Sequence, residues 1–113
     1  MSKEIKDITE KEVQAKITKW LAKHPNLWFT KSVQMSQNGV PDLIVCYKGR
    51  FVALEVKRPV GGKVSTLQQI QINSIIGAGG TARVVRSLDD AIEIINEIDA
   101  RLKMEVDQDD VFS

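Results

Sequence analysis

The 113-residue chain contains a single cysteine and no long apolar run. One cysteine cannot form a disulfide within the chain, which fits a reducing compartment. Cys46 lies inside an apolar run and is predicted to be a small core residue. No apolar stretch approaches membrane-spanning length, and the N-terminus MSKEIKDITEKEV is too polar for a secretion signal. We therefore expect an intracellular protein.

Acidic residues are nearly absent from the middle of the chain. The whole sequence has 15 of them, yet the stretch from Val13 to Leu88 contains only Asp42 and Glu55, together with 11 Lys and Arg. This stretch carries a formal charge of +9, although the whole chain carries only +1. A basic body suggests a polyanionic partner, and a solvated lysine-rich surface is the alternative.

The C-terminal segment EVDQDDVFS lacks bases and carries four acids. We expect this tail, residues 105–113, to be disordered, because it offers little apolar surface to bury. The remaining length is enough for one small domain with one core, so we expect a single domain over residues 1–104. No internal repeat is visible.

Residue patterns predict the element order α-β-β-β-α-β-α. Helices are expected from Thr9 to about His24, from Ser65 to the GAGG segment, and over residues 88–103, because each has a capping residue and apolar residues at helical spacing. Strands are expected over residues 27–35, 42–47, 50–57 and 81–87. This order predicts an α/β fold, a small mixed sheet flanked by helices. The helix between the third and fourth strands would make those two strands parallel.

Only Lys48 and Gly49 separate the second and third strands, which predicts a tight antiparallel hairpin. Counting outward from this turn fixes the residues that face each other. The predicted pairs are Tyr47–Arg50, Val45–Val52 and Leu43–Leu54.

The same register places Asp42 opposite Glu55. Side chains alternate along a strand, so Glu55 and Lys57 emerge on the same face. We therefore expect two adjacent carboxylates with an ammonium group beside them. A turn residue at Asp42 and an ordinary exposed strand face at Glu55 and Lys57 are the alternatives.

Adjacent carboxylates repel each other unless something neutralises them, and a divalent cation is the natural neutraliser. Mg²⁺ prefers a few carboxylate oxygens, several waters and substrate phosphates. Such an ion can activate water and polarise a phosphoryl group, with Lys57 facing the water or a phosphate oxygen. Phosphodiester hydrolysis is the simplest chemistry that this arrangement supports.

The residues GVPD and EVK, with 12 residues between Asp42 and Glu55, resemble the PD-(D/E)xK nuclease superfamily. The segments NGVPDLIV, ALEVKRP, GGKVSTLQQIQINSIIGAGG and ARVVRSLDDAIEII more closely resemble the VRR-NUC family, the virus-type replication-repair nucleases. This resemblance covers roughly Glu12 to Ile95 and is greatest to stand-alone phage and bacterial members. It implies a restriction-endonuclease-like core.

The resemblance also implies roles for the residues of the motif. Asp42, Glu55 and the backbone carbonyl of Val56 would ligate Mg²⁺ or Mn²⁺. Lys57 would position or activate the attacking water and stabilise charge on the phosphate.

Two further site residues are implied on the helices. Glu12 matches the helix-borne glutamate that reaches the site, often through a water on the metal, although it also fits a capping box with Thr9. Gln68 matches the glutamine of the following helix, with a capping box from Ser65 as the alternative role and Gln69 as the alternate residue.

For function, the resemblance implies a homodimeric, metal-dependent DNA endonuclease acting in replication, recombination or repair. A four-way (Holliday) junction is the favoured substrate. The alternatives are a flap or single-strand nuclease, and a nucleic-acid-binding module that no longer cuts. Aromatic residues make up only 5% of the chain, which leaves little material for stacking single-stranded bases and favours duplex or junction DNA. Expected phosphate contacts, with solvated surface as the alternative, are Arg58, Lys63, Arg83 and Arg86.

Overall fold

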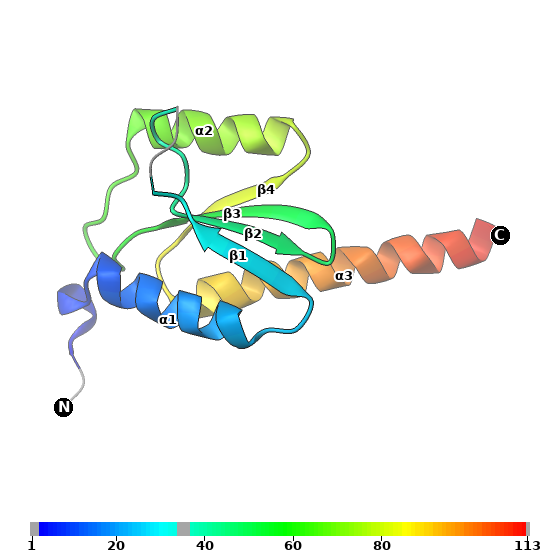
Figure 1. Ribbon diagram of the computed structural model, residues 1–113, viewed down its shortest axis with the longest axis horizontal. Coiled ribbons are helices and arrows are strands. Elements are labelled where there is room, and N and C mark those ends of the chain that lie inside the picture. The colour runs from blue at the N-terminus through cyan, green and yellow to red at the C-terminus, as the bar shows by residue number, and fades with distance from the viewer. Residues whose placement is uncertain (1–2, 34–36, 113) are drawn as a thin grey trace.

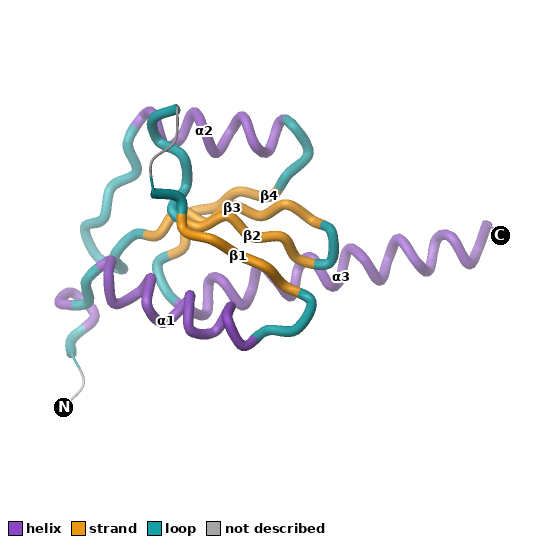
Figure 2. The backbone as a smooth tube through the Cα atoms, in the orientation of Figure 1, coloured by secondary structure: helices purple, strands orange, loops and turns teal. Residues whose placement is uncertain are grey.

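The computed structural model describes residues 3–33 and 37–112. The chain forms η1 (Ile5–Asp7), α1 (Glu10–Lys23), β1 (Leu27–Lys31), β2 (Leu43–Tyr47), β3 (Arg50–Val56), α2 (Thr66–Gly77), β4 (Thr81–Val85) and α3 (Leu88–Phe112). One four-stranded sheet has the order β1-β2-β3-β4. Helices α1 and α3 cover one face of this sheet and α2 lies on the other (Figures 1 and 2). The predicted α/β class is confirmed.

The predicted hairpin register is also confirmed. β2 and β3 are antiparallel and pair Tyr47 with Arg50 and Leu43 with Leu54. Lys48 and Gly49 have φ values of 48° and 80°, and a two-residue turn of this kind needs positive φ at both positions. β1 adds to β2 antiparallel, whereas β3 and β4 are parallel, with α2 as the crossover between them.

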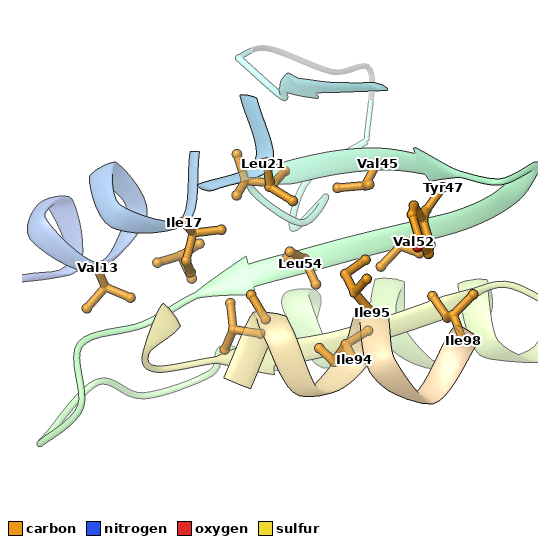
Figure 3. Packing of buried hydrophobic residues seen from close by; sticks show 14 residues of the cluster. Val13, Ile17, Leu21, Val45, Tyr47, Val52, Leu54, Ile94, Ile95 and Ile98 are labelled. Carbon is orange, nitrogen blue, oxygen red and sulfur yellow. The ribbon is translucent and has the colours of Figure 1, made fainter. Parts of the chain in front are cut away.

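The main core lies between the sheet and the pair α1 and α3 (Figure 3). Helix α1 contributes a buried stripe at helical spacing, and β2 and β3 contribute alternate residues. Among the buried residues of this core, Figure 3 labels Val13, Ile17, Leu21, Val45, Tyr47, Val52, Leu54, Ile94, Ile95 and Ile98.

A smaller core lies on the opposite face of the sheet, beneath α2. Ile72 of α2 packs on Ala53 of β3 and Ala82 of β4, whose small side chains let the helix approach closely. β3 is therefore buried on both faces at its C-terminal end. Glu55 shares a face with Ala53, so α2 covers a charged residue as well as an apolar one.

Two features of the β1–β2 side differ from the sequence-based expectation. β1 ends at Lys31, earlier than the predicted strand, and residues 34–36 of that prediction lie outside the described residues. Cys46 is exposed rather than part of the core. It pairs with Trp28, also exposed, at a point of the sheet that α2 leaves uncovered, because α2 packs on β3 and β4.

The acidic C-terminal segment, expected to be disordered, continues α3 as a helix to Phe112. Leu102 packs against the core, and Glu105 forms an ion pair with Arg50 of β3. These contacts anchor the helix on both sides of Lys103, so it runs on beyond the sheet (Figure 1).

Among the described helices, none is both long and apolar enough to cross a bilayer.

Candidate active site

The end of β1 fixes the position of Asp42. The Ser32 hydroxyl donates to the Pro41 carbonyl at 2.6 Å, and the Ser32 backbone N–H donates to the Asp42 carbonyl at 2.8 Å. The Asp42 side chain then reaches β3, where its Oδ2 accepts from the Val56 N–H at 2.8 Å. Asp42 is therefore attached to the strand that carries the second carboxylate.

Glu55 is the one charged side chain buried in the core of the described residues, with a relative exposure of 1%. Its Oε1 accepts from Gln68 Nε2 at 3.2 Å and lies 3.9 Å from Lys57 Nζ. Its Oε2 is buried and accepts no hydrogen bond from any described residue. A buried carboxylate oxygen without a donor is costly, which indicates that a cation or proton belongs there.

The protonation of Glu55 reflects this environment. Burial, together with the neighbouring Asp42 carboxylate, raises the pKa of Glu55 to about 8, against a weaker opposing effect of Lys57. At neutral pH the folded protein therefore favours the protonated form of Glu55, and a positive ion beside it would favour the charged form. A pair of this kind is a common signature of a functional site.

Gln68 performs both of the roles weighed for it. Its Oε1 accepts from the Ser65 N–H at 2.9 Å, and its own N–H donates to Ser65 Oγ at 3.1 Å, which completes a capping box. Its Nε2 remains free to donate to Glu55. The alternate residue Gln69 donates instead to Asn73, one turn along α2.

Glu12 is not brought to the site by the structure. Its carboxylate contacts Lys3 and accepts from Thr9 Oγ1 at 3.1 Å, and the Lys3 contact lowers the pKa of Glu12. Thr9 in turn caps α1 by accepting from the Glu12 N–H. Glu12 therefore takes part in the N-terminal cap of α1, through its backbone N–H and through the Thr9 hydroxyl.

Glu10 is the α1 glutamate nearest the site, and the sequence analysis missed it. Its charge contributes to the raised pKa of Glu55, and it shares a surface pocket of about 460 Å³ with Lys57. Glu10 is exposed, but it precedes Val13 by three residues and Ile17 by seven, so it lies on the face of α1 that carries the buried stripe. That spacing is the signal that would have found it.

Comparison with known proteins identifies the domain. The family model for the VRR-NUC domain matches residues 1–89. The chain belongs to the VRR-NUC family. This membership makes it a nuclease domain of the PD-(D/E)xK type.

Two solved structures of VRR-NUC domains share its fold. One, described as a VRR_NUC domain protein, is 21% identical with a TM-score of 0.65, covering 79% of this chain and 86% of that one. The other, described as a VRR_NUC domain, is 22% identical with a TM-score of 0.67, covering 79% of this chain and 97% of that one. No curated protein sequence matches this VRR-NUC domain.

The donor set of this VRR-NUC domain fits a divalent cation that also binds substrate. Within residues 3–33 and 37–112, no three His, Cys, Asp or Glu side chains gather into a complete metal cage. The adjacent pair Asp42 and Glu55, with its unpartnered oxygen, suits Mg²⁺, which commonly takes one or two carboxylates and completes its shell with water and phosphate.

Two of the four predicted phosphate contacts lie beside the motif lysine. Arg58 and Lys63 are exposed and line the same pocket as Lys57 and Glu10. This clustering gives the pocket a positive rim at the edge of the carboxylate pair.

The other two predicted phosphate contacts are engaged within the chain. Arg83 forms an ion pair with Glu97 of α3, and this pair raises the pKa of Arg83. Arg86 donates from Nη1 to the backbone carbonyls of Arg58 and Gly62, at 3.0 and 2.9 Å. Neither guanidinium is positioned as an uncommitted phosphate ligand.

Proposed function

We propose that this VRR-NUC domain is a metal-dependent endonuclease that hydrolyses phosphodiester bonds in DNA. The observation that carries the proposal is the buried Glu55, held between Asp42 and Gln68, with one carboxylate oxygen unpartnered and Lys57 3.9 Å from the other. A purely structural carboxylate would have its hydrogen bonds satisfied.

Each residue of the site has a distinct part in this proposal. Asp42 and Glu55 hold Mg²⁺ or Mn²⁺, and the family resemblance adds the Val56 carbonyl. When bound, the ion polarises the phosphoryl group and neutralises developing negative charge. Lys57, kept near Glu55, stabilises charge on the phosphate oxygens and positions the attacking water. Gln68 keeps Glu55 oriented through its hydrogen bond.

For the substrate, we propose branched DNA, with the four-way junction favoured. Support comes from the basic stretch of +9 between Val13 and Leu88, which suits a backbone contact, and from the low aromatic content. We also propose a homodimer, because a two-fold pair presents two sites for symmetric cutting of a junction. The intracellular setting expected from the sequence is part of the same proposal.

A cleavage panel tests the function. Labelled four-way, flap, duplex and single-stranded DNA are incubated with Mg²⁺, Mn²⁺ or EDTA, and the cuts are mapped. We expect metal-dependent cutting that is strongest on the junction and is lost in Asp42→Asn, Glu55→Gln and Lys57→Met. Gln69→Ala is the control that should cut like the wild-type protein, because its side chain bonds only Asn73 among the described residues.

Other outcomes of this panel select the alternatives. Preferential cutting of flaps or single strands would replace the junction as substrate. Tight, salt-sensitive junction binding without any cleavage would favour a binding module. Cutting that persists in EDTA or in Glu55→Gln would remove the metal-dependent mechanism.

A further inference from the structure

The geometry points to Arg86 as a positioning residue for the active site, acting through the loop between β3 and α2. This inference rests on the proposed nuclease function and assigns Arg86 a role other than the phosphate contact expected from the sequence. The loop, residues 57–65, begins at Lys57 and ends at Ser65, the cap of α2.

Arg86 closes this loop across its base. A single guanidinium nitrogen, Nη1, donates to the carbonyls of Arg58 at 3.0 Å and Gly62 at 2.9 Å. These two carbonyls flank the turn at residues 59–61. Two carbonyl oxygens that converge on one point repel each other without a donor between them, so the loop conformation depends on this nitrogen.

The loop is folded tightly enough to need such a closure. A Cβ on Gly62 would lie 3.1 Å from the backbone N and O of Arg58, which shows how closely the two ends of the turn approach. Gly61 has a φ of +84°, a conformation that favours glycine. The Arg58 guanidinium also donates to the Gly61 carbonyl, at 3.4 Å, so the two Arg86 contacts are the shorter side-chain hydrogen bonds that hold the turn.

Arg86 itself is well anchored. Its N–H donates to Asp90 Oδ2 at 2.8 Å, in the first turn of α3, and it directly follows Val85 of β4. The Val85 carbonyl accepts from the Lys57 N–H at 3.0 Å. Arg86, which bonds the loop, is thus adjacent in sequence to Val85, which bonds the backbone of Lys57.

Through this loop, Arg86 controls the two groups that flank Glu55. Lys57 lies at one end of the loop, and Ser65 at the other end orients Gln68 by the capping box. Arg58 and Lys63, which line the pocket with Lys57, lie on the loop itself. A loosened loop would leave Asp42 and Glu55 in place but displace the positive groups around them.

The first test measures loop order and chemistry separately. In Arg86→Gln, we expect amide hydrogen exchange at Lys57 and Ser65 to accelerate at least tenfold, because these amides at the two ends of the loop donate to the Val85 carbonyl and to Gln68 Oε1. The single-turnover cleavage rate at saturating junction DNA should fall by a similar factor. Arg101→Gln removes one positive charge from α3 without touching the loop, and it should leave exchange at Lys57 and Ser65 unchanged.

A double-variant cycle separates positioning from direct phosphate contact. The cycle compares junction affinity in Arg86→Gln, in Lys63→Gln and in the double variant. If Arg86 acts through the loop that carries Lys63, the double variant should lose less binding free energy than the sum of the two single losses. Arg86→Lys, which keeps the charge on a shorter side chain, serves as the second variant if the first fails to fold, and it should still loosen the loop.

The proposal is overturned if exchange at Lys57 and Ser65 stays at the wild-type rate in these variants, or if their defects in junction affinity are fully additive with Lys63→Gln and disappear at high salt, as expected for direct phosphate contacts. Because exchange and binding need no cleavage, these readouts remain decisive even if the wild-type protein cuts no DNA. That result would count against the nuclease function alone.

Discussion

Glu55 connects the charge of the site to the stability of the fold. Its folded pKa of about 8 lies above the ordinary value of 4.5, so the folded state favours the protonated form. The stabilisation is fully present below the unfolded pKa and is lost as pH rises through the folded one. In EDTA, we expect the free energy of unfolding, from urea denaturation, to fall between pH 5 and 9 by a few kcal/mol, since one pKa unit corresponds to about 1.4 kcal/mol.

The isosteric variant Glu55→Gln provides the control for this titration. It has no charge to bury, so its unfolding free energy should change much less over the same pH range. Adding Mn²⁺ or Mg²⁺ at pH 8 should raise the melting temperature of the wild-type protein and leave that of Glu55→Gln unchanged. An equal pH slope in both proteins would show that another group titrates.

The two glutamates of the first turn of α1 make a second matched pair. Because Glu10 lies in the pocket with Lys57 and its charge acts on Glu55, Glu10→Gln should slow cleavage roughly tenfold, the lower end of effects from outer-shell groups. Among the described residues, Glu12→Gln weakens contacts with Lys3 and Thr9 alone, and it should leave the rate nearly unchanged. Single-turnover rates on junction DNA measure both, and the opposite ranking would restore Glu12 as the site residue.

The sequence predicts the placement of Asp42, Glu55 and Lys57 because a two-residue turn leaves a single register. It does not show which of Glu10 and Glu12 lies closer to the carboxylate pair. Both lie in the first turn of a helix, the capping pattern fits Glu12, and the decision depends on how α1 docks on the sheet. Similarly, nothing in the sequence shows that the Arg86 guanidinium donates to the backbone carbonyls of Arg58 and Gly62.

Among the elements, the contact between the loop before β2 and the start of α2 sets the spacing of the site. A Cβ on Gly39 would lie 2.6 Å from the Leu67 carbonyl carbon and oxygen, and its φ is +82°. Gly39→Ala should therefore destabilise the fold by about 2–4 kcal/mol, as overpacking adds to backbone strain. Urea denaturation measures this loss, and cleavage should fall with it because Gln68 adjoins the displaced backbone.

Gly49 is the matched control for this substitution. Its φ of +80° is nearly the same, but nothing lies within 4 Å of its would-be Cβ. Gly49→Ala should cost only about 1 kcal/mol, the strain of a left-handed alanine. Equal losses in the two variants would mean that conformational strain, and not the close approach to α2, dominates at Gly39.

The elements themselves follow well from sequence where the signals are local. Capping residues and helical spacing locate α1 and α2, and the Lys48–Gly49 turn fixes the hairpin. The length of α3 does not follow, because its acidic composition argues for disorder while the Arg50–Glu105 ion pair that anchors it comes from a distant strand. The exposure of Cys46 depends in the same way on where α2 packs.

Charge is segregated across the whole molecule. The acids from Glu105 onward lie on the part of α3 that extends away from the body, toward the side opposite the start of β2, where Asp42 lies (Figure 1). Removing residues 105–113 changes the formal net charge from +1 to +5. We expect the shortened protein to bind junction DNA severalfold more tightly at low salt, with the difference disappearing at high salt. Fluorescence anisotropy over a salt series measures this, and equal affinity at low salt would exclude an electrostatic effect of this segment.

The single amide of Gln68 has a consequence for how the molecule responds to warming. Helix ends fray far more readily than whole domains unfold. The Gln68 side chain both caps the first turn of α2 and donates to Glu55. When that turn frays, the hydrogen bond from Gln68 to Glu55 is therefore lost as well. The fraction of molecules with a correctly oriented Glu55 therefore depends on local unfolding at the start of α2. This fraction should decline at temperatures where the rest of the protein is still folded.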